Sequence, residues 1–183
     1  MGYKHVFIVG IVFASLSLIL SVFATFTPIF YHDGLNICYD WWGIRYNCQT
    51  WEETYYASTN FCTSFKQLVY AGAAVNLAAD AAFAAIIILC AITLGCDVEP
   101  RLFRMICWII YLAGIGLCFS DCGIIVRLFG YSICGGETYG DLSYTRGASF
   151  GLINAAGCVS VMGTLFVALL PITDDHKDRV EAV

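Results

Sequence analysis

The chain of 183 residues is 60% hydrophobic and only 13% charged, with a formal net charge of −5. Soluble domains average about half apolar and about a quarter charged residues. The composition therefore excludes an ordinary soluble protein. The negative charge is spread along the chain, so we expect no nucleic-acid partner.

Four long apolar windows cover residues 6–30, 68–94, 103–128 and 150–172. Each is longer than the roughly 20 helical residues that cross the hydrocarbon core of a bilayer. The windows predict an all-α membrane fold, a bundle of four transmembrane helices forming a single domain over residues 1–183. The first window follows Lys4 but exceeds the roughly 7–15 apolar residues of a signal peptide, so an uncleaved anchor is favoured over a cleaved signal.

Four spans place both ends of the chain on the same side of the membrane. That side carries five basic residues in short segments next to the spans, namely Lys4, Arg101, Arg104, Lys177 and Arg179. Such residues favour the cytoplasmic face. We therefore expect a multi-pass plasma-membrane protein with cytoplasmic termini, a first outer loop over 31–66, a second over 129–149, and a cytoplasmic tail over 173–183.

The first outer loop contains an aromatic segment bounded by Cys38 and Cys48. A cytosol keeps such thiols reduced, so this pair indicates an oxidising, non-cytosolic side. A hairpin centred on Gly43 would place Cys38 opposite Cys48, close to disulfide distance. The same register gives two further cross-strand pairs, Trp41–Arg45 and Asp40–Tyr46.

Four of the ten cysteines lie in the outer loops: Cys38, Cys48, Cys62 and Cys134. Four cysteines allow three pairings. The simplest is Cys38–Cys48 with Cys62–Cys134, in which the second bond links the two outer loops. We expect a small extracellular β-hairpin or sheet, formed by the first outer loop, to cap the outer ends of the helices.

The cysteine-bounded segment resembles the signature of amastins, surface proteins of trypanosomatid parasites. The matching positions are Cys38, Trp42, Gly43, Arg45, Asn47 and Cys48. The long first loop and short second loop also resemble the more distant claudins, by layout alone. The resemblance implies a surface protein acting in adhesion, membrane contact or host–parasite interaction. Amastins are described as glycoproteins, but the chain has no Asn-x-Ser/Thr sequon, so any glycan here would be of another type.

Aromatic and arginine side chains dominate the energetics of protein interfaces. The candidates for a contact surface in the first outer loop are Trp41, Trp42, Arg45, Tyr46, Tyr55 and Tyr56. Alternatively, half of them form the core of the cap. Expected partners are membrane lipids, a facing membrane or a host surface protein. A homo-oligomer and a claudin-like barrier of side-by-side copies remain further options.

Polar residues inside the apolar windows are Asn76, Asp80, Asp121 and Asn154. An ionised carboxylate inside a membrane costs at least about 2.5–3.5 kcal/mol, so it needs a partner or a proton. Counting from the outer helix ends, Asp80 is about 20 Å deep and the other three are about 8–14 Å deep. We expect a polar cluster joining the second, third and fourth helices. A structural role is favoured over the alternative, a small proton or ion transporter using Asp80 and Asp121.

Stripes of small residues are expected to pack inside the bundle, among them one of Ser17, Ser21 and Thr25 and another of Ala74, Ala78 and Ala82. Enzyme chemistry is not expected. The histidines His5, His32 and His176 lie near termini or loop edges, so no catalytic or metal-binding cluster forms. We expect no cofactor and no metal ion.

Overall fold

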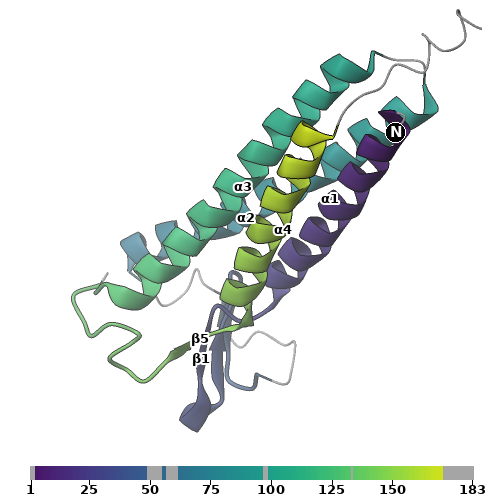
Figure 1. The fold of residues 1–183 in the computed structure, drawn as a ribbon. Helices are drawn as coiled ribbons and strands as arrows, with labels where there is room; N and C mark the ends of the chain where they lie inside the picture. The colour runs from purple at the N-terminus through teal and green to yellow at the C-terminus, as the bar shows by residue number, and fades with distance from the viewer. Residues whose placement is uncertain (1–2, 49–54, 57–61, 97–98, 133, 171–183) are drawn as a thin grey trace, which may run out of the picture.

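Four long helices form the body of the molecule. A computed structural model describes residues 3–48, 55–56, 62–96, 99–132 and 134–170 (Figure 1); the expected tail over 173–183 lies outside them. The helices are α1 (Tyr3–Phe26), α2 (Thr63–Gly95), α3 (Pro100–Gly130) and α4 (Ala148–Leu169). Each is long and apolar enough to cross a membrane, which confirms the predicted four spans. Both α1 and α3 pack against α2 and α4.

The first helix ends at Phe26 rather than at residue 30 as predicted. Pro28 explains the difference, because a residue that precedes proline disfavours the helical conformation. Beyond this end the chain passes very close to the start of α4. A Cβ atom on Gly147 would collide with the carbonyl group of Pro28, so glycine is required for the approach.

The outer loops form a five-stranded antiparallel sheet in the order β4-β3-β2-β1-β5. The strands are β1 (Phe30–His32), β2 (Ile37–Tyr39), β3 (Gly43–Arg45), β4 (Tyr55–Tyr56) and β5 (Thr145–Arg146), and the short helix η1 (Asp33–Leu35) connects β1 to β2. The predicted β cap is therefore confirmed. It is larger than expected, because β5 comes from the second outer loop.

Two disulfides stabilise the outer loops, one within the first loop and one between the two loops. Cys38 and Cys48 are joined with a Cα–Cα distance of 5.5 Å. Cys62, just before α2, is joined to Cys134, just after α3, with a Cα–Cα distance of 5.9 Å. Both predicted pairings are confirmed, and the second bond and β5 together attach the second outer loop to the first.

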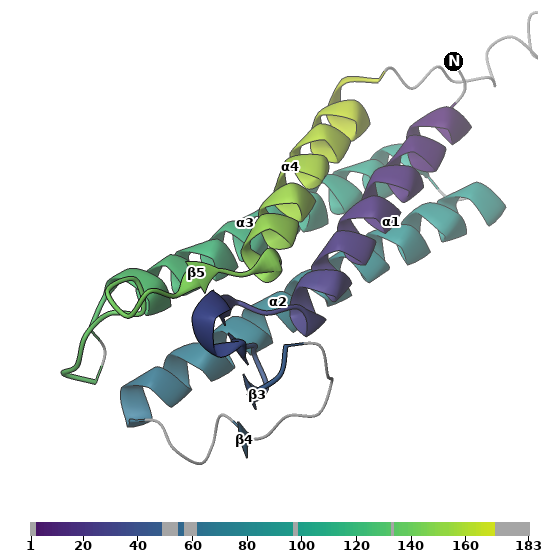
Figure 2. The same ribbon diagram turned by 90° about the horizontal axis from the view of Figure 1, so that it is seen from below.

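The helices differ in length, and the cap lies where the two longer helices extend beyond the two shorter ones. Helices α2 and α3 have 33 and 31 residues, whereas α1 and α4 have 24 and 22. At about 1.5 Å per residue, the longer pair is longer by about 13 Å. The Ser21 hydroxyl donates to the Asn76 side chain, so α1 ends beside α2 near this residue. The outer turns of α2 and α3, residues 63–74 and 123–130, therefore form an overhang, and the sheet lies beside it (Figures 1 and 2).

The turn between β2 and β3 differs from the predicted hairpin. Cys38 pairs with Arg45 and Tyr39 pairs with Ile44, so the hairpin is centred between Trp41 and Trp42 instead of on Gly43. The predicted cross-strand pairs Cys38–Cys48, Trp41–Arg45 and Asp40–Tyr46 are therefore wrong. The chain after β3 bends back and brings Cys48 to Cys38 without strand pairing.

Asp40 explains this register. Its Oδ1 accepts the backbone N–H groups of Trp42 and Gly43 at 2.9 and 2.8 Å, which fixes a tight turn. Its Oδ2 pairs with Nε of Arg45 at 3.0 Å, and both side chains are 4% exposed. Burial raises the pKa of Asp40, whereas the two N–H donors and the Arg45 guanidinium lower it. One carboxylate thus stabilises the turn and neutralises a buried cation.

We predict that Asp40→Ala lowers the free energy of unfolding by about 3–5 kcal/mol, because it removes the turn acceptor and the buried carboxylate that pairs with Arg45. Denaturant unfolding of the protein in detergent, followed by tryptophan fluorescence, measures this change. The control is Asp141→Ala, which removes an exposed carboxylate of the second outer loop and should cost less than about 1 kcal/mol. Equal losses for the two variants would contradict the role of Asp40.

Candidate functional site: the cap and the polar residues beneath it

Trp41 anchors the cap to the helices. Its side chain is 1% exposed. A Cβ atom on Gly72 of α2 would collide with the Trp41 ring, so the absence of a side chain there provides the space that the indole fills. The prediction that Trp41 belongs to a contact surface is wrong, because the ring is part of the core between cap and overhang.

Trp42 lies at the edge of the cap next to α1. Its Nε1 donates to the carbonyl oxygen of Thr25 at 3.1 Å, so it satisfies one of the carbonyl groups left free at the end of a helix. The side chain is 37% exposed. Tryptophan is typical of the membrane interface, where an apolar ring and a polar N–H group are both accommodated. We assign Trp42 to the membrane edge of the cap rather than to its outer surface.

Arg45 is also excluded from the predicted contact surface, because its charge is buried against Asp40. Tyr55 and Tyr56 form β4. Their side chains lie outside the described part of the structure, so their assignment stays a prediction. Of the six predicted contact residues, Tyr46 remains as an exposed aromatic residue of the cap, with 51% of its surface accessible.

The outermost part of the cap combines Tyr46 with Leu35, Asn36 and Asn47. Nδ2 of Asn36 donates to Oδ1 of Asn47 at 3.2 Å, which joins the end of η1 to the segment after β3. Leu35 is 60% exposed. We call these four residues the tip. In Figure 1 the turn between β1 and β2 points away from the helices.

Sequence reasoning missed Leu35. The signal was present, because this single leucine lies between Gly34 and Asn36 in a turn where no core position is expected. An isolated apolar residue in such a turn is exposed unless the loop folds back. Here the loop is held open as η1, in which the Leu35 backbone N–H donates to Nδ1 of His32 at 3.2 Å.

An aromatic cluster holds the second outer loop on the cap. The ring centroid of Tyr139 lies 5.1 Å from that of Phe30, 5.3 Å from that of Tyr39 and 5.3 Å from that of Tyr144. It also lies 5.7 Å from the ring of Phe65 on α2. Burial raises the pKa of Tyr39 and of Tyr139 well above the usual tyrosine range. Tyr139 therefore connects both outer loops with the overhang.

Beneath the cap, polar side chains of three helices meet. The Ser21 hydroxyl donates to Oδ1 of Asn76 at 3.1 Å, and the Thr25 hydroxyl donates to Oδ2 of Asp80 at 3.4 Å. Asp121 of α3 is fully buried, and neither of its carboxylate oxygens has a hydrogen-bond donor among the described residues. It is close enough to Asp80 for the two groups to interact electrostatically.

This cluster differs from the predicted one in its membership. Asn154 of α4 donates to the Phe150 carbonyl of its own helix at 2.8 Å, so α1 rather than α4 completes the cluster. The hydroxyl stripe of α1 is buried as predicted: Ser17, Ser21 and Thr25. The alanine stripe of α2 is not, since Ala74 and Ala78 are exposed on the helix surface. One hydroxyl of the α1 stripe, that of Thr25, thus donates to the carboxylate of Asp80.

We predict that Gly72→Ala destabilises the protein by about 1–3 kcal/mol, because the added methyl group overpacks the Trp41 site. The effect opposes helix propensity, which favours alanine by about 1 kcal/mol. Gly95→Ala on the same helix is the control, since a Cβ atom there meets nothing. Thermal unfolding in detergent compares the two. A Gly72→Ala variant as stable as the control would contradict the packing of Trp41.

The comparisons with known proteins agree with this architecture. A family model described as Amastin surface glycoprotein matches residues 7–167, a stretch that contains both disulfides and the whole cap. No curated protein and no solved structure matches the chain. Because the family model covers most of the sequence, the chain belongs to the Amastin surface glycoprotein family.

Proposed function

We propose that this multi-pass surface membrane protein acts in adhesion or membrane contact through the tip of its cap. The observation that carries the proposal is the exposure of Leu35, on the β1–β2 turn directed away from the helices, and of Tyr46, in the segment after β3 that Asn47 joins to this turn. Exposed aromatic and aliphatic groups beside amides suit a protein–protein contact, because they supply apolar area together with hydrogen-bonding groups. A host-cell surface protein or a facing membrane is the proposed partner, consistent with a family of surface proteins.

The proposed orientation places the cap outside the cell and both termini in the cytoplasm. Two disulfides in the cap support this orientation, because disulfides persist in oxidising compartments. The opposite end carries Arg101 and Arg104 at the start of α3. The Arg104 guanidinium donates to the carbonyl groups of Val167 and Ala168, so a cation caps the inner end of α4.

We predict that Tyr46→Ala and Leu35→Ser each weaken adhesion at least about fivefold, the loss expected for a residue that contributes more than about 1 kcal/mol to binding. The protein is reconstituted in fluorescent liposomes, and liposome binding is measured on host cells and on protein-free phosphatidylcholine vesicles. Leu142→Ser is the control, an exposed apolar residue of the second outer loop that lies outside the tip. Binding that is unchanged in both tip variants would contradict the proposal.

The second candidate function is proton or cation transport. The observation that favours it is the Asp121 carboxylate, which is fully buried without a hydrogen-bond donor in the described residues. A buried carboxylate without donors must hold a proton or a cation, since its desolvation is otherwise too costly. Asp80 lies close by and has one oxygen without a partner.

For transport, we predict that Asp121→Asn and Asp80→Asn abolish proton flux into liposomes that contain a pH-sensitive dye. Asparagine keeps the shape of the side chain but cannot release a proton. Asn154→Ala serves as the control, because this amide bonds to its own helix. A wild-type flux no higher than that of empty liposomes would eliminate this candidate and leave the carboxylates a structural role.

A further inference from the structure

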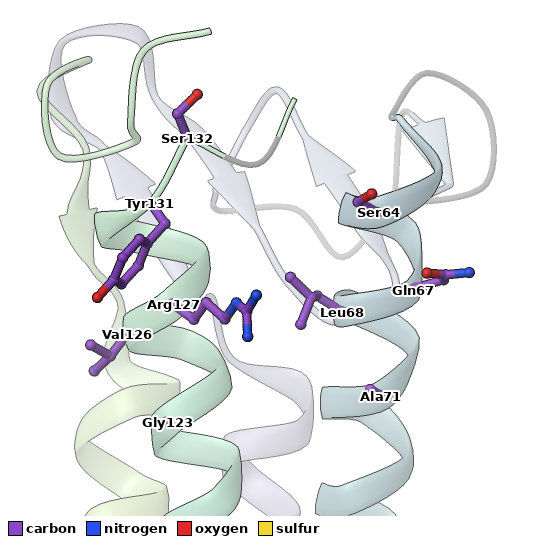
Figure 3. A pocket seen from close by; sticks show the side chains of 9 residues that line it. All are labelled: Ser64, Gln67, Leu68, Ala71, Gly123, Val126, Arg127, Tyr131 and Ser132. Carbon is purple, nitrogen blue, oxygen red and sulfur yellow. The ribbon is translucent and has the colours of Figure 1, made fainter. Parts of the chain in front are cut away.

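A cleft of about 920 Å³ opens between the outer ends of α2 and α3 (Figure 3). Its lining includes Ser64, Leu68, Ala71, Val126, Arg127 and Ser132. The volume is that of a site for a ligand of moderate size. Hydroxyl groups lie at the outer end of the cleft and apolar side chains lie toward the membrane, so the cleft suits an amphipathic ligand.

The packing of α2 on α3 sets the position of the cleft along the helices. Three contacts follow one antiparallel register: the Sγ atoms of Cys90 and Cys107 lie 3.7 Å apart, Phe83 packs on Gly114, and Cys62 is bonded to Cys134. The same register places Asp121 opposite Asn76 and Arg127 opposite Tyr70. The cleft therefore lies wholly within the overhang.

The height of the cleft relative to a bilayer follows from α1. The 20 residues between His5 and Thr25 span about 30 Å, the thickness of the hydrocarbon core. Ser21 is bonded to Asn76, which lies opposite Asp121, so the outer edge of the core is about 6 Å beyond this carboxylate. Arg127, six residues after Asp121, is then about 3 Å outside the core. This is the layer of lipid phosphate groups.

The Arg127 guanidinium is the charged group of the cleft. Figure 3 shows its side chain extending from α3 into the space between the helices, toward Leu68. It is exposed, and neither a hydrogen bond nor an ion pair to it is found in the described part of the chain. A guanidinium binds phosphate through paired N–H donors. Tyr70 and Tyr131, both exposed, flank this height as interfacial tyrosines do.

We propose that the cleft between α2 and α3 binds one phospholipid, with its phosphate on Arg127 and its glycerol and upper acyl carbons on Leu68, Ala71 and Val126. The charge on Arg127, its height in the headgroup layer and the apolar floor below it each select this ligand. A soluble phosphate lacks the apolar part, and a neutral glyceride lacks the charge. The lipid would fill the space that separates the overhanging helices and so support the face of α2 and α3 opposite the cap.

Native mass spectrometry of the delipidated protein in detergent tests the proposal, with phosphatidylglycerol, dioleoylglycerol or inorganic phosphate added in turn. We expect one phosphatidylglycerol to bind, and Arg127→Gln to weaken binding at least about tenfold through loss of the charge-assisted hydrogen bonds. Gly123→Phe should have a similar effect, because a Cβ atom on Gly123 points into open space and the ring would fill the cleft. Gly116→Phe is the control: two turns inward on the same helix, its Cβ also meets nothing.

Intact disulfides and an unchanged unfolding temperature in all three variants show that any loss is local. The proposal is overturned if phosphatidylglycerol binds Arg127→Gln or Gly123→Phe as tightly as wild type. It is also overturned if dioleoylglycerol binds equally well, or if inorganic phosphate competes with the lipid at millimolar concentration. Equal losses in Gly116→Phe would attribute the effect to the helix surface rather than to the cleft.

Discussion

The structure of the cap depends on the contacts of one buried carboxylate, that of Asp40. It accepts two backbone N–H groups of the β2–β3 turn and pairs with Arg45, so it determines where the chain reverses. The turn in this position directs Trp41 inward onto Gly72 and Trp42 onto the end of α1. A reversal centred on Gly43 would place both indoles elsewhere. The attachment of the cap to the bundle therefore follows from one side chain at a turn.

The unequal lengths of the helices give the cap its place. Helices α1 and α4 match the thickness of a bilayer, whereas α2 and α3 continue outward and present a wall of side chains. The sheet packs on one face of this wall through Trp41, Phe65 and the tyrosine cluster. The cleft that contains Arg127 opens between the same two helices. A protein of this size thus builds an extramembrane unit by extending two of its spans.

Features that depend on the composition of whole segments were predictable from the sequence, whereas features that depend on one local contact were not. Four spans and two disulfides were predictable, because apolar length and compartment chemistry are properties of whole segments. The hairpin register was not, because symmetry about Gly43 ignored the ability of Asp40 to bond the turn. Burial of Trp41 and Arg45 agrees with the alternative that half of the six contact candidates form the core of the cap, but the sequence did not indicate which half. The polar cluster was predicted in part, because the depth of a residue in the membrane can be counted from its position in the helix. Which faces of α1 and α4 point inward is decided by helix packing, so the participation of α1 instead of α4 was not predictable.

A cap with two defined disulfides packs on the outer ends of two long helices. The most direct test is peptide mapping by mass spectrometry of protein purified from membranes and alkylated without reduction. We expect linked peptides for Cys38–Cys48 and Cys62–Cys134, with an alkyl group on each of the other six cysteines. An alkylated Cys38 or Cys62, or a peptide joining Cys38 to Cys134, would contradict this arrangement.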